Sequence, residues 1–169
     1  LWGNLRQPAQ AKQKRMAEVT RLLDQKAGDV KAGEEVFAQV CAACHTMFGK
    51  GAQIGPDLTG YERGNREFLL TAIVDPNLGV REEFELVTIT LRARDGENDN
   101  AVLSGFIKEL TDASVRLVDL TGNDTVVATK DILNKQNSPV SIMPEGLIDA
   151  LTETQIQDLF SYLQAASAP

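Results

Sequence analysis

The chain of 169 residues has few cysteine, histidine, methionine and aromatic residues. It contains two cysteines, one histidine and three methionines, and aromatic residues make up 5% of the sequence. No apolar stretch approaches the roughly 18 to 20 residues that a membrane-spanning helix needs. Acidic residues outnumber basic ones by 24 to 17, and the net charge of -7 argues against nucleic acid as a partner. The hydrophobic fraction of 43% is that of an ordinary folded domain.

Both cysteines and the only histidine fall within one short segment, Cys41-Ala42-Ala43-Cys44-His45. This C-x-x-C-H arrangement is the attachment pattern of c-type haem. On a helical turn, residues three and four positions apart share one face. Cys41 and Cys44 can therefore reach the two vinyl groups of a haem, while the imidazole of His45 points to the iron as an axial ligand.

Other uses of these residues fit the sequence less well. A structural zinc site needs four ligands, and the chain has no second Cys/His pair. A thioredoxin-type dithiol is expected after a strand of a βαβ unit, whereas residues 31–40 are predicted to be helical. A simple disulfide would leave the adjacent His45 unexplained. We therefore expect one covalently attached haem c as the cofactor.

The scarcity of ligand residues also narrows the choice of a second axial ligand. His45 is the only histidine, so a second histidine ligand from this chain is excluded. Met16 lies in the N-terminal segment, and Met47 follows His45 too closely to reach the opposite haem face. Met143 lies in residues 141–146, where proline and glycine favour an irregular loop. We predict His45 and Met143 as the iron ligands, with a place in the core as the alternative for this methionine.

Capping residues predict two further helices. Asn65 or Gly64 is placed to begin a helix over Arg66–Val74. Thr152 and Gln155 form a capping box at the start of the last helix, which carries an apolar stripe. Four apolar residues at helical spacing would either line the haem or pack in the core without touching it: Phe68, Leu69, Ala72 and Ile73.

With these features in order, the chain resembles class I cytochromes c. Gly33 and Phe37 are spaced as in the first helix of that family, and Leu159 and Tyr162 fit the last helix, which crosses the first. Residues 55–60 match the segment whose proline carbonyl, in the family, accepts a hydrogen bond from the proximal imidazole. Besides the two cysteines, the residues expected to contact the haem are Pro56, Leu58, Phe68 and Ile142.

Between the predicted iron ligands, apolar residues alternate from about residue 84 to residue 134, and turn sequences separate the alternating segments. The strand-like segments are residues 86–91, 102–110, 115–120, 125–129 and Ile132-Leu133. Four or five short strands suggest a small antiparallel barrel or curled sheet, with Gly105 at a sharp bend. Because this region has no Cys, His or Met, we assign it to partner docking or to covering the haem.

A β insertion before the ligand methionine also resembles the haem-binding domain of planctomycete and verrucomicrobial type. In that family C-x-x-C-H, G-P-D-L, a D-G-x…L-S-G region and an S-x-M-P-x-G-L loop follow in this order. The corresponding segments here are residues 41–45, 55–58, Asp95-Gly96 with 103–105, and 141–147. The resemblance covers about residues 30–165 and implies frequent fusion to large periplasmic or extracellular proteins.

The expected fold class is α+β: a mainly α cytochrome c fold with an inserted small antiparallel β-barrel or sheet. Residues 1–29 would form an amphipathic helix or linker, and 30–80 the N-terminal part of the cytochrome with the attachment site. Residues 81–136 would form the β-rich insertion, and 137–169 the methionine loop and the last helix.

The predicted function is that of a monohaem electron carrier rather than an enzyme, cycling between Fe(III) and Fe(II). A redox protein is the expected partner, as donor or acceptor, and membrane association is not expected. The family resemblance implies a periplasmic or other extracytoplasmic location. Arg63 or Arg66 is a candidate for neutralising a haem propionate, with solvated surface charge as the alternative. A haem-based sensor with a displaceable Met143 is the second functional hypothesis. A catalytic haem domain such as a peroxidase is the third, and it is disfavoured because the chain has no second histidine to act as a distal acid or base.

Overall fold

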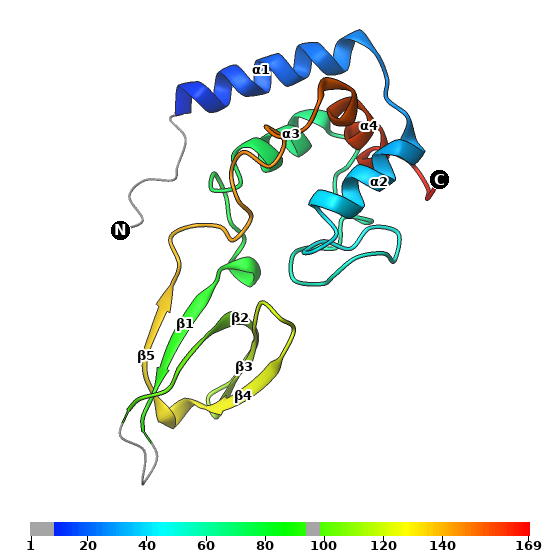
Figure 1. Cartoon of the computed structure of the whole chain (residues 1–169). Coiled ribbons are helices and arrows are strands. Elements are labelled where there is room, and N and C mark those ends of the chain that lie inside the picture. The colour runs from blue at the N-terminus through cyan, green and yellow to red at the C-terminus, as the bar shows by residue number, and fades with distance from the viewer. Residues whose placement is uncertain (1–8, 94–98) are drawn as a thin grey trace. The chain divides into compact units, whose positions relative to one another are not determined.

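The computed structural model describes residues 9–93 and 99–169, which form two compact units (Figure 1). The first unit holds the described residues up to Leu78 together with Met143–Pro169, and the second is Gly79–Ile142. The helices of the first unit are α1 (Ala9–Gln25), α2 (Val30–Val40), α3 (Arg66–Val74) and α4 (Glu153–Leu163). The expected α+β composition is confirmed. None of the described helices is long and apolar enough to cross a membrane.

Three of the helices begin at side chains that accept hydrogen bonds from backbone N–H groups left without partners in the first turn. Asp29 accepts from Ala32 N at 2.7 Å at the start of α2, and Asn65 accepts from Phe68 N at 3.1 Å at the start of α3. At α4, Gln155 N donates to Thr152 Oγ1 at 3.2 Å, and Thr152 N donates to Gln155 Oε1 at 2.9 Å. The predicted capping box is therefore confirmed, and so is Asn65 as the cap of α3.

Helices α2 and α4 cross with almost no side chain between them at Gly33. A Cβ atom at Gly33 would lie 2.0 Å from Asp158 O and 2.7 Å from Tyr162 Cβ, so only glycine fits there. One turn further along α2, the rings of Phe37 and Tyr162 pack with their centroids 5.4 Å apart. The crossing of the first and last helices that the resemblance implied is thus present, at the residues expected to form it.

The apolar core of the first unit lies where all four helices meet. Helix α1 contributes Val19 and Leu22 and also binds α4 through Gln157 Nε2, which donates to Leu22 O at 3.0 Å. The buried core residues are Val19, Leu22, Val36, Phe37, Met47, Leu69, Leu70, Val74, Ile148, Ile156, Leu159, Phe160, Tyr162 and Leu163. The apolar stripe predicted for the last helix belongs entirely to this core.

The second unit is a five-stranded antiparallel sheet in the order β4-β3-β2-β1-β5. Its strands are β1 (Val87–Leu91), β2 (Val102–Leu110), β3 (Ser114–Val118), β4 (Asp124–Ala128) and β5 (Ile132–Asn137). Two short 3-10 helices are η1 (Glu82–Phe84) and η2 (Thr129–Asp131). The last strand extends beyond the predicted Ile132-Leu133, and the predicted turn at Asp95-Gly96 lies outside the described residues.

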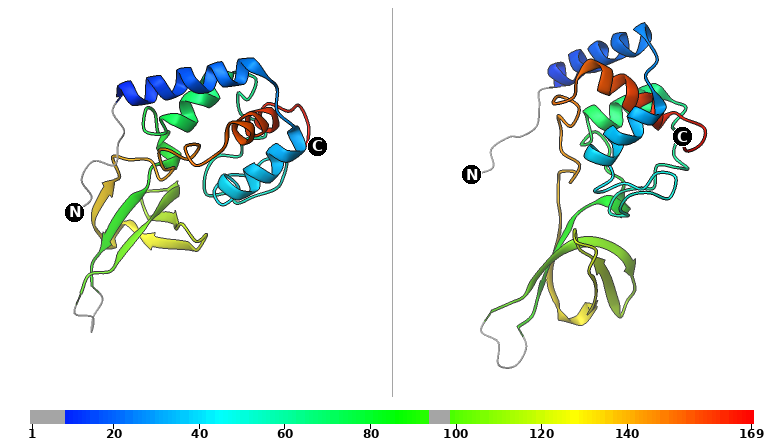
Figure 2. Two further views of the ribbon diagram at one scale, coloured as in Figure 1. Left: turned by 45° about the horizontal axis from the view of Figure 1, so that its top comes forward. Right: turned by 45° about the vertical axis from the view of Figure 1, so that its right-hand side comes forward.

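Strand β2 joins the two halves of the sheet, and it changes its partner strand after Gly105, where a sharp bend is predicted. Residues 102–105 pair with β1, while residues 106–110 pair with β3. A Cβ atom at Gly105 would lie 2.5 Å from Val118 O, so glycine permits the close approach at this bend. The sheet curls around its own apolar core, which includes Val87, Ile89, Val115, Leu117 and Val127 (Figure 2). Because β4 and β5 remain the two ends of the strand order, this is a curled sheet and not a closed barrel.

Replacing Gly33 by alanine tests the close crossing of α2 and α4. The added methyl group has no room beside Asp158 O, and overpacking of this kind typically costs about 1–3 kcal/mol of the free energy of unfolding. Thermal unfolding of Gly33→Ala should therefore show a lower Tm than the unmutated chain. Gly60→Ala is the matched control, because a Cβ atom at Gly60 meets nothing within 4 Å. Equal Tm values for the two variants would contradict the close crossing.

Candidate haem-attachment site

The C-x-x-C-H segment forms a turn that continues directly from the end of α2. Cys41 N donates to Phe37 O at 2.8 Å, which completes the last helical hydrogen bond. Cys44 N and His45 N then both donate to Cys41 O, at 3.1 and 2.9 Å. These are the bonds of a helical turn, so residues 41, 44 and 45 have the spacing that the motif requires.

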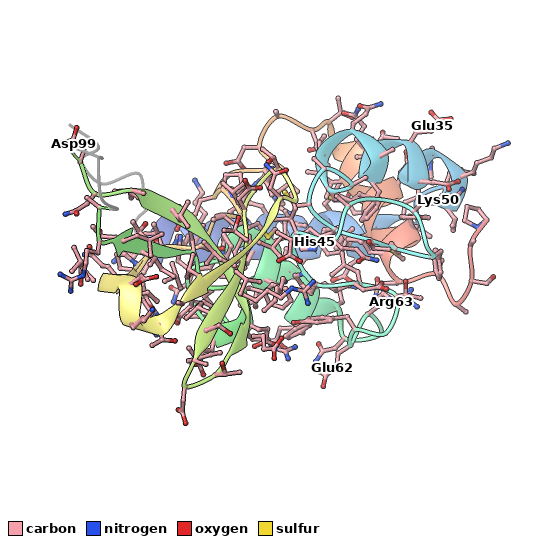
Figure 3. The ribbon with its side chains drawn as sticks, turned by 90° about the horizontal axis from the view of Figure 1, so that it is seen from below. Glu35, His45, Lys50, Glu62, Arg63 and Asp99 are labelled. Atoms are coloured by element: carbon pink, nitrogen blue, oxygen red, sulfur yellow. The ribbon has the colours of Figure 1, made fainter. Side chains whose placement is uncertain are left out.

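The loop after the motif is bound to it by backbone hydrogen bonds. Ala52 N donates to Ala42 O at 2.9 Å, Gly55 N to Cys44 O at 2.7 Å, and Leu58 N to Thr46 O at 2.8 Å. Gly51 has a φ of +109°, and a Cβ atom there would lie 2.1 Å from His45 O. The chain therefore returns along the motif turn, and these hydrogen bonds hold the turn in place. Figure 3 labels His45 within this region.

The imidazole of His45 is fixed by the residues that the returning loop brings to it. His45 Nδ1 lies 3.0 Å from Pro56 O. Because a carbonyl oxygen only accepts, Nδ1 is the donor of this hydrogen bond, and in the neutral imidazole this leaves the lone pair on Nε2. The backbone of Gly55 packs closely against the imidazole ring, because a Cβ atom there would be 2.7 Å from His45 Cε1. The ring is thus held in the tautomer and orientation that a metal-binding Nε2 requires.

The two thiols are free and half-buried, and Cys41 packs against the core of the first unit. Burial, with the nearby Cys44 as a smaller cause, raises the pKa of Cys41 to about 12. Reactive redox cysteines have the opposite property, a pKa lowered toward neutrality. Among the described residues, no three His, Cys, Asp or Glu side chains are grouped as a metal cluster. Neither the dithiol nor the zinc alternative is therefore supported.

The three methionines occupy different environments. Met47 is fully buried in the core, and its backbone pairs with that of Lys50 in a tight turn. Met16 belongs to α1, and its sulfur lies 3.9 Å from Thr71 Oγ1 of α3. Met143 is half-buried and begins the irregular segment that leads to α4. Met47 and Met143 both lie on loops of the first unit, but Met47 is fully buried and Met143 is half-buried.

The other predicted haem contacts have separate positions. Pro56 meets His45 as described, and Leu58 packs against the core of the first unit. Phe68 is half-buried and its ring lies 5.7 Å from that of Tyr61. Ile142 precedes Met143 in the chain but closes the second unit, and its contact with haem stays a prediction.

Both arginines considered for a haem propionate have protein partners. Arg63 Nη1 donates to Leu163 O at 3.1 Å and to Ala165 O at 2.6 Å, at the end of α4 (Figure 3). Its guanidinium also lies 5.0 Å from the centroid of the Phe48 ring. Arg66 pairs with Asp24 of α1 at 2.6 Å. Sequence reasoning missed these roles because the partners are distant in sequence and leave no local pattern.

This set of residues fits a c-type haem. Two thiols three residues apart, an imidazole with Nε2 available and an apolar environment are the donor set of covalent haem attachment. The chemistry of the donors and the glycine that lies against the imidazole ring both agree with it.

Comparison with known proteins agrees with this chemistry. Residues 30–84 match the cytochrome c family. Cytochrome c-type cyt cy of Rhodobacter capsulatus is 58% identical over 33 residues, which are 20% of this chain and 16% of that protein. Cytochrome c of Guizotia abyssinica is 54% identical over 35 residues, which are 20% of this chain and 32% of that protein. The matched segments thus span less than a third of each relative. The chain contains a cytochrome c family domain over residues 30–84.

Proposed function

We propose that the chain is a monohaem electron-transfer module, with one haem bound through Cys41 and Cys44 and with His45 and Met143 as axial ligands. The observation that carries this proposal is the hydrogen bond of 3.0 Å between His45 Nδ1 and Pro56 O inside an intact C-x-x-C-H turn. Neither a redox dithiol nor a disulfide would need an adjacent histidine in one fixed tautomer. The bound iron supplies a one-electron Fe(III)/Fe(II) couple.

The residues of the chain have distinct parts in this proposal. The thioethers of Cys41 and Cys44 keep the cofactor bound in both oxidation states. Pro56 O accepts the Nδ1 proton of His45, which raises the basicity of Nε2 and favours the ferric state. The thioether of Met143 is a soft donor that raises the reduction potential. Leu58 and Phe68 would exclude water from the site.

We also propose the kind of protein to which this module belongs and the kind of partner it has. The order of motifs supports the planctomycete and verrucomicrobial type, in which such a domain belongs to a larger extracytoplasmic protein. The partner would be a redox protein that donates or accepts single electrons. Within the described residues, β4 and β5 are the two edge strands of the curled sheet, and their outer backbone groups would be available to a partner strand.

Replacing each methionine in turn identifies the sixth ligand. Met143→Leu should abolish the weak charge-transfer band of the ferric protein near the red end of the visible spectrum and lower the reduction potential, because the thioether is lost. Met16→Leu and Met47→Leu are matched controls, since exchange of these residues conserves volume and usually costs less than about 1.5 kcal/mol. Both controls should keep the band in optical spectra of the holoprotein.

A band that persists in Met143→Leu would contradict the assignment of this ligand. Rapid binding of carbon monoxide by the unmutated ferrous protein would instead favour a ligand-binding sensor, because the sixth position would then be open. Slow or undetectable binding in the unmutated protein, with rapid binding in Met143→Leu, is the result we expect.

Gly55→Ala tests the fixed orientation of the imidazole. The new methyl group would meet His45 Cε1 at 2.7 Å and push the ring away from Pro56 O. Loss of this hydrogen bond makes Nε2 a weaker donor to Fe(III), so the reduction potential should rise in a spectroelectrochemical titration. Gly64→Ala, where a Cβ atom meets nothing within 4 Å, should leave the potential unchanged. An unchanged potential in Gly55→Ala would show that this hydrogen bond does not tune the iron.

A further inference from the structure

Helix α1 lies outside the segment that matches the cytochrome c family, yet it is bound to the rest of the first unit along its length. Near its C-terminus, Asp24 pairs with Arg66 of α3 at 2.6 Å. Near its N-terminus, α1 meets both the end of α3 and the segment before α4 (Figure 2). The N-terminal contacts involve the loop that begins with Met143.

Lys12 is the centre of these contacts. Its Nζ lies 2.6 Å from Asp75 Oδ1, at the C-terminal cap of α3, and 2.7 Å from Glu145 Oε1. The side chains of Lys12 and Glu145 are each only 7% exposed. Asn77 Nδ2 donates to the same Glu145 oxygen at 2.6 Å. A lysine is almost never this buried unless it is paired, so the two carboxylates explain its position.

This ion-pair network affects Met143 because Glu145 lies two residues after Met143 in the chain. Only Pro144 separates Glu145 from Met143, and the ring of Pro144 restricts the backbone between them. Fixing the Glu145 carboxylate against Lys12 and Asn77 therefore limits where the backbone of Met143 can lie.

Arg15, on the same face of α1 as Lys12, makes a second tie to this loop. Arg15 Nε lies 3.0 Å from Asp149 Oδ1, and Arg15 Nη2 donates to Ile148 O at 3.2 Å. The loop is also closed internally, because Asp149 N donates to Gly146 O at 2.9 Å. Residues 145–149 are thus held at both ends by one turn of α1.

We propose that α1 positions the loop of Met143, with Lys12 as the positioning residue that binds Glu145 to Asp75. The inference rests on the proposed function, since it concerns ligation by Met143. Without Lys12, two carboxylates would remain close together and shielded from water, and their repulsion would move Glu145 away from α3. The loop would then leave the iron more readily, and an external ligand would bind more tightly in its place.

The test uses the full-length ferric holoprotein and measures the affinity for imidazole, which must displace the sixth ligand. Lys12→Met removes the charge but keeps the length of the side chain, and it should bind imidazole at least about fivefold more tightly than the unmutated protein. Lys14→Met is the matched control on the same helix. Lys14 is exposed, and its ion pair with Glu18 of the same helix is long, with 3.9 Å between Nζ and Oε1. The affinity of Lys14→Met for imidazole should not change.

A purely structural role for Lys12 would lower the Tm of Lys12→Met without changing the affinity for imidazole, and this result would overturn the proposal. Hydrogen exchange gives a second readout at two amides of this loop, that of Asp149 and that of Leu151, which donates to Ile148 O at 3.3 Å. Both should exchange faster in Lys12→Met. Lys12→Arg, which keeps the charge, should restore most of the original affinity. Unchanged exchange in Lys12→Met would equally contradict a positioning role.

Arg15→Gln keeps the proposal testable if Lys12→Met does not accumulate as folded protein. It should shift the imidazole affinity in the same direction by a smaller factor, and an unchanged affinity would then overturn the proposal. Met143→Leu separates the two hypotheses: if it binds imidazole no more tightly than the unmutated protein, ligation by Met143 is itself wrong. If Met143→Leu binds more tightly and Lys12→Met does not, only the role of Lys12 fails.

Discussion

The close crossing of α2 and α4 is the contact on which the rest of the first unit depends. Helix α2 ends in the haem-attachment turn, and α4 follows the segment that begins with Met143, more than a hundred residues later in the chain. Gly33 lets the two backbones approach until Asp158 O fills the space of a side chain. Arg63 adds to the same junction by donating to two carbonyls at the end of α4. The crossing thus joins two segments that are far apart in the sequence into one core.

The two units have separate apolar cores. The core of the first unit contains only residues of the four helices and their loops, while that of the second contains only residues of the curled sheet. All the proposed haem attachment points and iron ligands belong to the first unit. Among the described residues, the sheet therefore supplies no side chain to the buried apolar core of the first unit.

Local features of this fold were predictable from the sequence because each depends on residues close together in the chain. Asn65 and the pair Thr152 with Gln155 predicted helix starts, since capping requires only four consecutive residues. The strand Val102–Leu110 was predicted with its observed bounds, because apolar alternation and flanking turns define it. By contrast, β5 extends beyond Ile132-Leu133 because its last residues are exposed and polar, and give no alternating pattern.

The contacts that join distant segments could not be predicted. Lys12 and Glu145 are 133 residues apart, and nothing in their local sequences distinguishes them from ordinary surface charges. The same holds for the bonds of Arg63, a candidate for neutralising a haem propionate, to carbonyls 100 and 102 residues away. The attachment motif is the exception among functional features, because covalent haem chemistry needs its three residues at a fixed local spacing.

Mass spectrometry of the denatured protein, produced in cells that attach c-type haem, tests the central claim most directly. The account predicts that the intact chain is heavier by one haem, and that the proteolytic peptide containing Cys41 and Cys44 carries the whole of this added mass. Protein from the same cells that is folded and colourless, with the mass of the unmodified chain, would contradict the account.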